Sequence, residues 1–142
     1  MPTIKTKYLG ELRTEATHLQ SGTVLLTDAP TDNHGRGEAF SPSDLVAGAL
    51  GSCMITIMGI VARRDEIDLV GTELEITKVM TAELPRRIAQ VEVLLEMVTD
   101  RELAREEKAK LERAAHTCPV ALSLHPDIEQ VVRFNWKVAQ EV

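Results

Sequence analysis

The chain has 142 residues, of which 44% are hydrophobic, 27% are charged and only 3% are aromatic. This length suits one domain covering residues 1–142, and such a domain can bury a sizeable core without disulfides or metal. The formal net charge is −6, and the lysines and arginines are scattered along the chain. Because a nucleic-acid-binding protein should show a basic stripe, no nucleic-acid partner is expected.

The N-terminal part predicts strands followed by a loop. Residues 3–17 and 23–28 have the composition of strands, joined by a turn at residues 19–22, LQSG. Residues 29–40, APTDNHGRGEAF, are rich in Pro, Asp, Asn and Gly, so we expect a loop long enough to have a functional role. Residues 1–7 lack the apolar core of a secretory signal, and a cytoplasmic location is expected.

Residues 45–62 form an uncharged run of 18 residues, LVAGALGSCMITIMGIVA. As a helix this run would be about 27 Å long, slightly short of a membrane's hydrocarbon core, and we interpret it as a buried core helix. Ser41 can cap this helix, Pro42 suits its first position, and Asp44 lies three residues after the cap. The run has no water-facing stripe, and a chain of this size can hardly cover it. We therefore expect two chains to associate around it.

The second half predicts a strand hairpin, an amphipathic helix and a final strand, at residues 69–81, 88–98, 100–117 and 131–138. Thr99 and Glu102 resemble a capping box at the start of the helix. In the second strand of the hairpin, alternate apolar residues should face the core: Val91, Val93, Leu95 and Met97. The order β-β-α-β-β-α-β predicts an α+β domain with a mainly antiparallel sheet.

The chain has two cysteines, Cys53 in the apolar helix and Cys118 at the end of the amphipathic helix, 65 residues apart. In a reducing compartment three interpretations stay open: transient redox chemistry, metal ligation and core packing. His116 could join both cysteines around zinc, but no ligand pair has the spacing of a zinc finger, so no metal is expected. Inert packing is common for free cysteines, which are among the most buried residues.

A reactive cysteine needs more than a thiol, because the nucleophile is the thiolate. Cys53 lies about three turns into its helix, too far from the N-terminus for the helix dipole to help much. A cation must therefore come from elsewhere in the fold. Arg13 in the first strands and Arg36 in the loop are candidates. A buried arginine would need a carboxylate, for which Glu38, Asp28 and Asp44 are available, although Asp44 has a competing role at the helix N-terminus.

Two motifs together closely resemble the OsmC/Ohr family of osmotically induced and organic hydroperoxide resistance proteins. The first runs from Phe40 to Met54, FSPSDLVAGALGSCM, and the second from His116 to Val120, HTCPV. The order of elements also fits, so the resemblance covers nearly the whole chain. Because Ser43 stands where hydroperoxide resistance proteins carry a glutamate, the chain resembles the broader OsmC-like branch. The resemblance implies an intertwined homodimer with active sites at the subunit interface, and it implies no metal, haem or flavin.

The resemblance also implies a mechanism. Cys53 matches the residue that attacks a small organic hydroperoxide and becomes a sulfenic acid. Cys118 matches the residue that resolves it as a Cys53–Cys118 disulfide, which an external dithiol such as dihydrolipoamide reduces. Arg13 matches the family's arginine. The family's glutamate ten residues before the reactive cysteine is Ser43 here, and Glu38 is the hypothesised replacement.

The sequence therefore predicts a thiol-dependent peroxidase that serves in oxidative-stress defence. One alternative is an OsmC-like stress or ligand-binding protein with little peroxidase activity, for which the Cys53 thiol would have ordinary acidity. The other is a structural or interaction protein, in which both cysteines would tolerate replacement.

Overall fold

The computed structural model describes residues 1–140 and divides the chain into two compact units, Met1–Val46 and Ala47–Val142. Helix α1 (Pro42–Arg64) begins in the first unit and continues in the second. Over the described residues the structure has two three-stranded sheets and three α-helices, which confirms the predicted α+β class. The single domain over residues 1–142 stays a prediction, and each unit is described by itself.

The first unit contains an antiparallel sheet in the order β1-β2-β3. Its strands are β1 (Ile4–Gly10), β2 (Arg13–His18) and β3 (Val24–Asp28). The loop that follows β3 contains one turn of 3-10 helix at Thr31–Asn33 and returns to the sheet, where Phe40 bridges Thr27.

The prediction of one strand over residues 3–17 was wrong, because this stretch is a hairpin of β1 and β2. The chain reverses at Glu11 and Leu12, whose φ angles are 56° and 63°. Positive φ at both central residues suits the twist of a two-residue hairpin, and Gly, Asn and Asp are the residues that usually supply it. The Glu-Leu pair carries no such signal, so the turn was missed.

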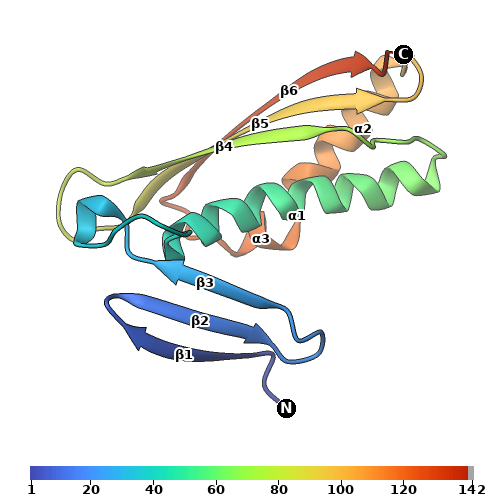
Figure 1. Ribbon diagram of the computed structural model, residues 1–142. Helices are drawn as coiled ribbons and strands as arrows, with labels where there is room; N and C mark the ends of the chain where they lie inside the picture. The colour runs from blue at the N-terminus through green and yellow to red at the C-terminus, as the bar shows by residue number, and fades with distance from the viewer. Residues whose placement is uncertain (141–142) are drawn as a thin grey trace. The chain divides into compact units, whose positions relative to one another are not determined.

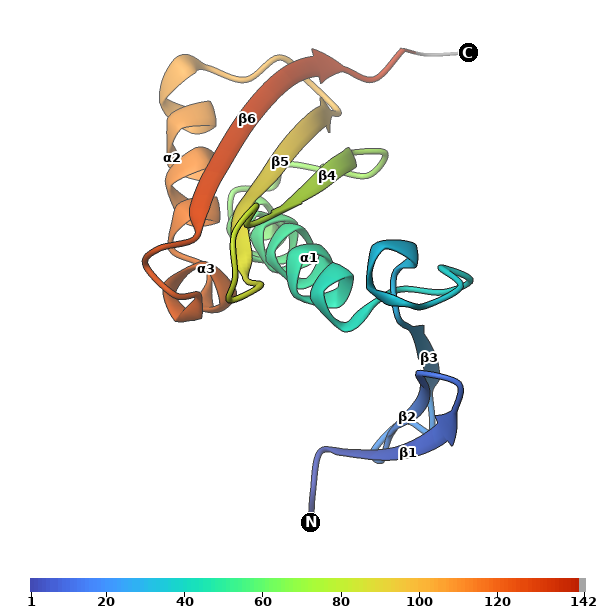
Figure 2. The same ribbon diagram turned by 90° about the vertical axis from the view of Figure 1, so that its left-hand side faces the viewer.

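The second unit packs its helices against one face of a sheet in the order β4-β5-β6 (Figures 1 and 2). The strands are β4 (Glu73–Met80), β5 (Ile88–Thr99) and β6 (Glu129–Val138). The helices α2 (Arg105–His116) and α3 (Pro119–Ser123) connect β5 to β6.

The pairing within this sheet is partly as predicted. β4 and β5 form the expected antiparallel pair, whereas β5 and β6 are parallel. A parallel neighbour requires a crossover that brings the chain back to the end where the first strand began, and α2 with α3 provides it. Three of the four strand pairs in the two sheets are antiparallel, so the mainly antiparallel character is confirmed.

The hydrophobic core lies between this sheet and the helices. The four residues predicted to face inward from β5 are at most 1% exposed, which confirms the alternation: Val91, Val93, Leu95 and Met97. Met54 and Met58 of α1 and Leu111 of α2 are also fully buried in this core.

Helix α1 begins as the sequence predicts. The Ser41 hydroxyl accepts a hydrogen bond from the Asp44 N–H at 3.0 Å, and the Asp44 carboxylate accepts one from the Ser41 N–H at 2.9 Å. This reciprocal pair is a capping box. The Asp44 carboxylate is therefore engaged in capping the start of the helix.

Helix α1 is long and apolar enough to cross a membrane by length and composition alone, with a mean hydropathy of 2.1 over its most apolar 18 residues. Only 33% of that window is buried. Val46 and Ile60 on the opposite side are 38% and 45% exposed. The prediction of a helix buried on all sides is therefore met on one side only within a single chain.

The capping box predicted at the second helix was wrong. Strand β5 extends through Thr99, whose buried hydroxyl donates to the Arg101 carbonyl at 2.7 Å. Helix α2 starts later, where the Glu107 carboxylate accepts a hydrogen bond from the Ala104 N–H at 2.9 Å. The sequence contains two possible starts for this helix, at Thr99 and at Ala104. Because β5 extends through Thr99, the helix begins at the second.

The approach of α1 to β4 can be tested at Gly51. A Cβ atom there would lie 2.5 Å from Cδ1 of Ile76. We expect Gly51→Ala to be destabilising, because overpacking costs about 1–3 kcal/mol and the gain in helix propensity is only about 1 kcal/mol. The free energy of unfolding in urea measures this loss.

The matched control removes the atom that the new methyl group would meet. Ile76→Val lacks Cδ1 and alone should cost about 0.5–1.5 kcal/mol. In the Gly51→Ala background it should instead restore part of the lost stability. Losses that simply add in the double variant would contradict the close contact.

Candidate active site

The two cysteines meet in the second unit. Cys53 lies in the middle of α1 and is partly exposed, while Cys118 lies between α2 and α3 and is 0% exposed. The Cys53 side chain is near enough to Cys118 to raise the pKa of the Cys118 thiol, and both thiols are free. Two residues 65 positions apart in the sequence are thus neighbours in the fold.

Local sequence explains the position of Cys118. Pro119 cannot continue α2 but suits the first position of a helix, so the chain leaves α2 and begins α3 at this point. Cys118 has an extended backbone and serves as the N-cap of α3, where its Sγ accepts a hydrogen bond from the Ala121 N–H at 3.4 Å. The cap holds the sulfur in a fixed place.

The surroundings of Cys118 keep its thiol protonated. Burial raises the pKa of Cys118, the Ala121 N–H partly opposes this, and the hydrogen bond and charge of Cys53 raise that pKa further. A protonated Cys118 can donate its S–H to a Cys53 thiolate. Cys53 is therefore the more accessible of the two sulfurs, and Cys118 is the more protected one.

The first unit brings together the two other residues named from the sequence. Nη1 of Arg13 lies 3.3 Å from Oε2 of Glu38, and the two side chains are 27% and 54% exposed. Arg13 begins β2, and Glu38 lies on the loop that follows β3. Arg36, the other candidate cation, is exposed and has no ion pair among the described residues. The catalytic roles of Arg13 and Glu38 stay predictions.

A residue weighed only as an available carboxylate turns out to be central to this pair. Asp28 is 0% exposed, and its Oδ2 accepts a hydrogen bond from the Glu38 N–H at 3.0 Å. Burial of a carboxylate at a strand end cannot be recognised from one sequence. The cross-strand position of Asp28 opposite Arg13 also depends on a hairpin that the sequence did not reveal.

The remaining polar residues near the motifs have structural contacts. The ring of His116 packs edge-on against Phe134, with centroids 6.1 Å apart. The hydroxyl of Ser43 lies 3.2 Å from that of Ser41 at the start of α1. Within residues 1–140, no three His, Cys, Asp or Glu side chains are grouped so that they could hold a metal ion.

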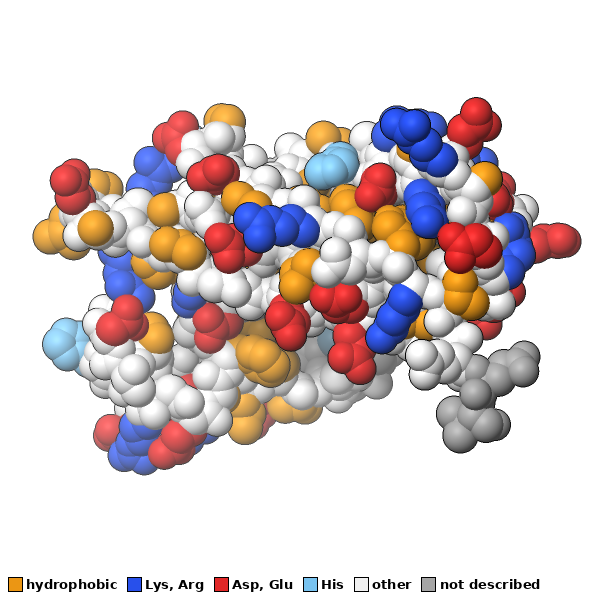
Figure 3. Space-filling view, turned by 90° about the horizontal axis from the view of Figure 1, so that it is seen from above, with side chains coloured by type: hydrophobic (Ala, Val, Ile, Leu, Met, Phe, Trp, Pro, Cys, Tyr) orange, Lys and Arg blue, Asp and Glu red, His pale blue; other side chains and the backbone are white. Residues whose placement is uncertain are grey.

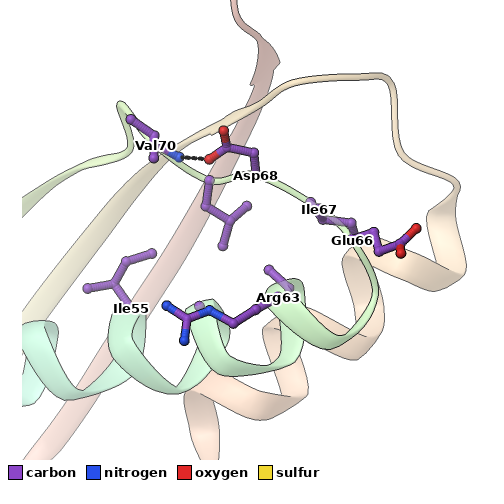
Figure 4. Close-up of a pocket in the computed structure, with 9 residues that line it drawn as sticks. Ile55, Arg63, Glu66, Ile67, Asp68 and Val70 are labelled. Atoms are coloured by element: carbon purple, nitrogen blue, oxygen red, sulfur yellow. Dashed lines mark hydrogen bonds between the residues drawn. The ribbon is translucent and has the colours of Figure 1, made fainter.

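A pocket of about 500 Å³ opens beside the C-terminal half of α1 (Figure 4). Apolar side chains such as Ile55 and Ile67 line it, and the Arg63 side chain extends into it while Glu66 points away. Neither cysteine is among its lining residues. The face shown in Figure 3 carries acidic and basic side chains interspersed, without a large patch of one sign.

Comparison with known proteins identifies the family. The family profile described as OsmC-like protein matches residues 35–132. The chain belongs to the OsmC-like protein family. No curated protein matches it.

Among solved structures, one from Psychrobacter arcticus 273-4 is 51% identical, with a TM-score of 0.88 over 95% of this chain and 96% of that chain. It is provisionally described as an osmotic stress induced and detoxification response protein. An organic hydroperoxide resistance protein OsmC from Legionella pneumophila is 19% identical, with a TM-score of 0.68 over 94% and 97% of the two chains. The organic hydroperoxide resistance protein OhrB of Bacillus subtilis is also 19% identical, with a TM-score of 0.63 over 94% and 98%. The last two similarities show the fold alone.

The difference between the two thiols predicts an order of chemical modification. In the reduced protein, iodoacetamide should label Cys53 first at neutral pH, because Cys118 is buried and its raised pKa keeps it protonated. Labelling of Cys118 should increase only at a pH above the pKa of an ordinary thiol. Peptide mass spectrometry over a time course measures both rates, and protein unfolded in guanidinium, where both should react alike, is the control. Faster labelling of Cys118 than of Cys53 would contradict the predicted order.

Proposed function

We propose that this OsmC-like protein is a thiol-dependent peroxidase that reduces organic hydroperoxides to alcohols. The observation that carries the proposal is that the partly exposed Cys53 and the buried Cys118 are neighbours in the fold. Membership of the family supports it, as does a fold shared with proteins named for organic hydroperoxide resistance.

The chemistry needs only the two sulfurs and a reductant. The Cys53 thiolate attacks one oxygen of the hydroperoxide, the O–O bond breaks, and the alkoxide takes a proton and leaves as the alcohol. Cys53 is thereby oxidised to a sulfenic acid. Cys118 then attacks that sulfur, its S–H proton leaves with the hydroxyl group as water, and the Cys53–Cys118 disulfide forms. An external dithiol, such as dihydrolipoamide, returns both cysteines to thiols by exchange.

Two properties of Cys118 suit it to the second step. Its position at the N-cap of α3 keeps the sulfur next to Cys53, so the sulfenic acid is trapped before further oxidation. Its burial keeps it away from the peroxide. The division of roles follows from exposure and proton affinity.

The cation in this proposal is Arg13. A guanidinium next to Cys53 would favour the thiolate and the charge that develops on the leaving oxygen. Glu38 holds one edge of the guanidinium, so the remaining N–H groups of Arg13 are directed by that ion pair.

A second candidate function retains the fold and lacks the efficient chemistry. The carboxylate of Glu38 is 54% exposed and meets Arg13 through one contact of 3.3 Å, which is a loose arrangement for a catalytic ion pair. On this hypothesis the protein binds a ligand or acts in stress, and peroxide turnover is slow and incidental.

The peroxidase assay separates these candidates. The wild type should consume cumene hydroperoxide with dihydrolipoamide as reductant, and Cys53→Ser should lose about 100-fold or more, because it removes the nucleophile. Cys118→Ser should still reduce about one equivalent of peroxide, after which its turnover with the dithiol should be impaired. Slow wild-type turnover, or turnover unchanged in Cys53→Ser, would favour the binding protein.

We also propose a cytoplasmic homodimer as the working form. The hydrophobic core of the described residues lies wholly in the second unit. The first unit instead exposes large apolar side chains, including Tyr8 at 65%, Leu26 at 43% and Phe40 at 58%. Exposed apolar surface on this scale supports association with a second chain, and the uncovered side of α1 adds to that support.

The dimer is tested by a charge placed on α1. Light scattering of the wild type should give twice the chain mass of 15.7 kDa. Ile60→Glu should shift the protein towards monomer, since a carboxylate buried in an apolar contact without a partner is costly. Leu84→Glu, in the exposed loop between β4 and β5, should leave the mass unchanged. A monomeric wild type would contradict the proposal.

A further inference from the structure

Asp28 is the one residue whose side chain leaves a buried polar atom without a partner among residues 1–140. Its carboxylate is 0% exposed, and Oδ1 accepts no hydrogen bond from the described residues. A buried carboxylate oxygen without a donor is costly, so a residue that retains one calls for an explanation.

The other atoms of Asp28 hold the loop that carries Glu38. Oδ2 accepts from the Glu38 N–H at 3.0 Å, and the Asp28 N–H donates to the Phe40 carbonyl at 3.0 Å. The Gly37 N–H donates to the carbonyl of the neighbouring Ala29 at 3.3 Å. The returning loop is therefore fastened to the end of β3 on both sides of Glu38.

The register of the sheet places Asp28 directly opposite Arg13 on the antiparallel pair β2–β3. Side chains opposite each other on such a pair project from the same face, with Cβ atoms about 5 Å apart. The Arg13 guanidinium has several N–H donors, and its ion pair with Glu38 uses Nη1 alone. The unused donors of Arg13 and the unused acceptor of Asp28 thus belong to neighbouring side chains.

We propose that Asp28 is a positioning residue for Arg13. Through Oδ2 it fixes the backbone of Glu38, and its unpaired Oδ1 is the buried carboxylate oxygen that receives the guanidinium when the contact with Glu38 is lost. Glu38 is exposed to solvent and its contact is easily lost, whereas a buried carboxylate keeps its attraction for the guanidinium. Asp28 keeps Arg13 in place whenever Glu38 releases it.

The inference rests on the proposed function, in which Arg13 favours the Cys53 thiolate. It goes further by assigning a role to a residue that touches neither the substrate nor the reacting sulfur. A purely structural role for Asp28 would need only an oxygen that accepts the Glu38 N–H, while the positioning role needs the negative charge.

Asp28→Asn separates the two roles, because asparagine retains an oxygen for the Glu38 N–H and loses the charge. The readout is the pH dependence of Cys53 alkylation by iodoacetamide, measured on the full chain carrying Cys118→Ser so that only Cys53 reacts. We expect Asp28→Asn to move the midpoint to higher pH, towards that of Arg13→Gln. In the chain with both cysteines it should lower kcat/KM for cumene hydroperoxide about 10-fold, as expected for contacting residues.

The double variant completes the test. If Asp28 acts through Arg13, Asp28→Asn should change nothing further in the Arg13→Gln background. A wild-type alkylation profile in folded Asp28→Asn, or effects that add in the double variant, would overturn the proposal. Asp28→Ser, whose hydroxyl can also accept the Glu38 N–H, is the second variant where the asparagine variant does not fold. Loss of folding in both would overturn the positioning role, because the carboxylate would then serve the fold.

Failure of the proposed function has a different signature. If the wild type does not consume peroxide, the proposed peroxidase function is wrong. A shift of the alkylation profile that Asp28→Asn and Arg13→Gln share would still establish the positioning role. The wild type could instead be active while Arg13→Gln shows the wild-type pH profile of Cys53 alkylation. That result would overturn the role of Asp28 and leave the peroxidase proposal intact.

Discussion

Helix α1 packs one side against the β4-β5-β6 sheet, and this contact fixes the position of Cys53. Gly51 lies two residues before Cys53 and lets the helix approach β4 so closely that a Cβ atom there would meet the Ile76 side chain. Met54 immediately after Cys53 is fully buried in the same core. The cysteine is therefore held near Cys118 by its own helix, without a flexible loop on the α1 side.

The second constraint is the burial of Cys118. In a reducing environment two neighbouring thiols would compete for the same oxidant if both were equally exposed and acidic. The N-cap position puts Cys118 inside the core, and burial together with Cys53 raises the pKa of Cys118. Cys118 is therefore kept protonated and away from solvent, while Cys53 stays partly exposed.

The sequence was most informative where local chemistry decides the structure. The start of α1 at Ser41 follows from capping preferences, and the inward side of β5 follows from a strict alternation of apolar residues. It was least informative where long-range geometry decides. The hairpin turn at Glu11 and Leu12 uses positive φ without a turn-forming residue, and the parallel pairing of β6 depends on how α2 and α3 cross the sheet. The sequence predicted that Arg13 would need a carboxylate such as Glu38. The burial of Asp28 opposite Arg13 could be recognised only from the strand register of the folded sheet.

The division of the chain into two units has a consequence for the chemistry. The cysteine pair belongs to the unit that has its own hydrophobic core, so the two thiols can be set in place by that unit alone. The Arg13–Glu38 pair and Asp28 belong to the unit that lacks such a core, and in the proposed dimer association would support the order of that unit. If Arg13 favours the thiolate of Cys53, linkage requires that whatever orders the first unit also favours the thiolate, and that thiolate formation favours the ordered assembly in return. Reactivity and assembly would then be coupled: a dissociated chain could still form the disulfide, but its Cys53 would lack the cation that makes it a fast nucleophile.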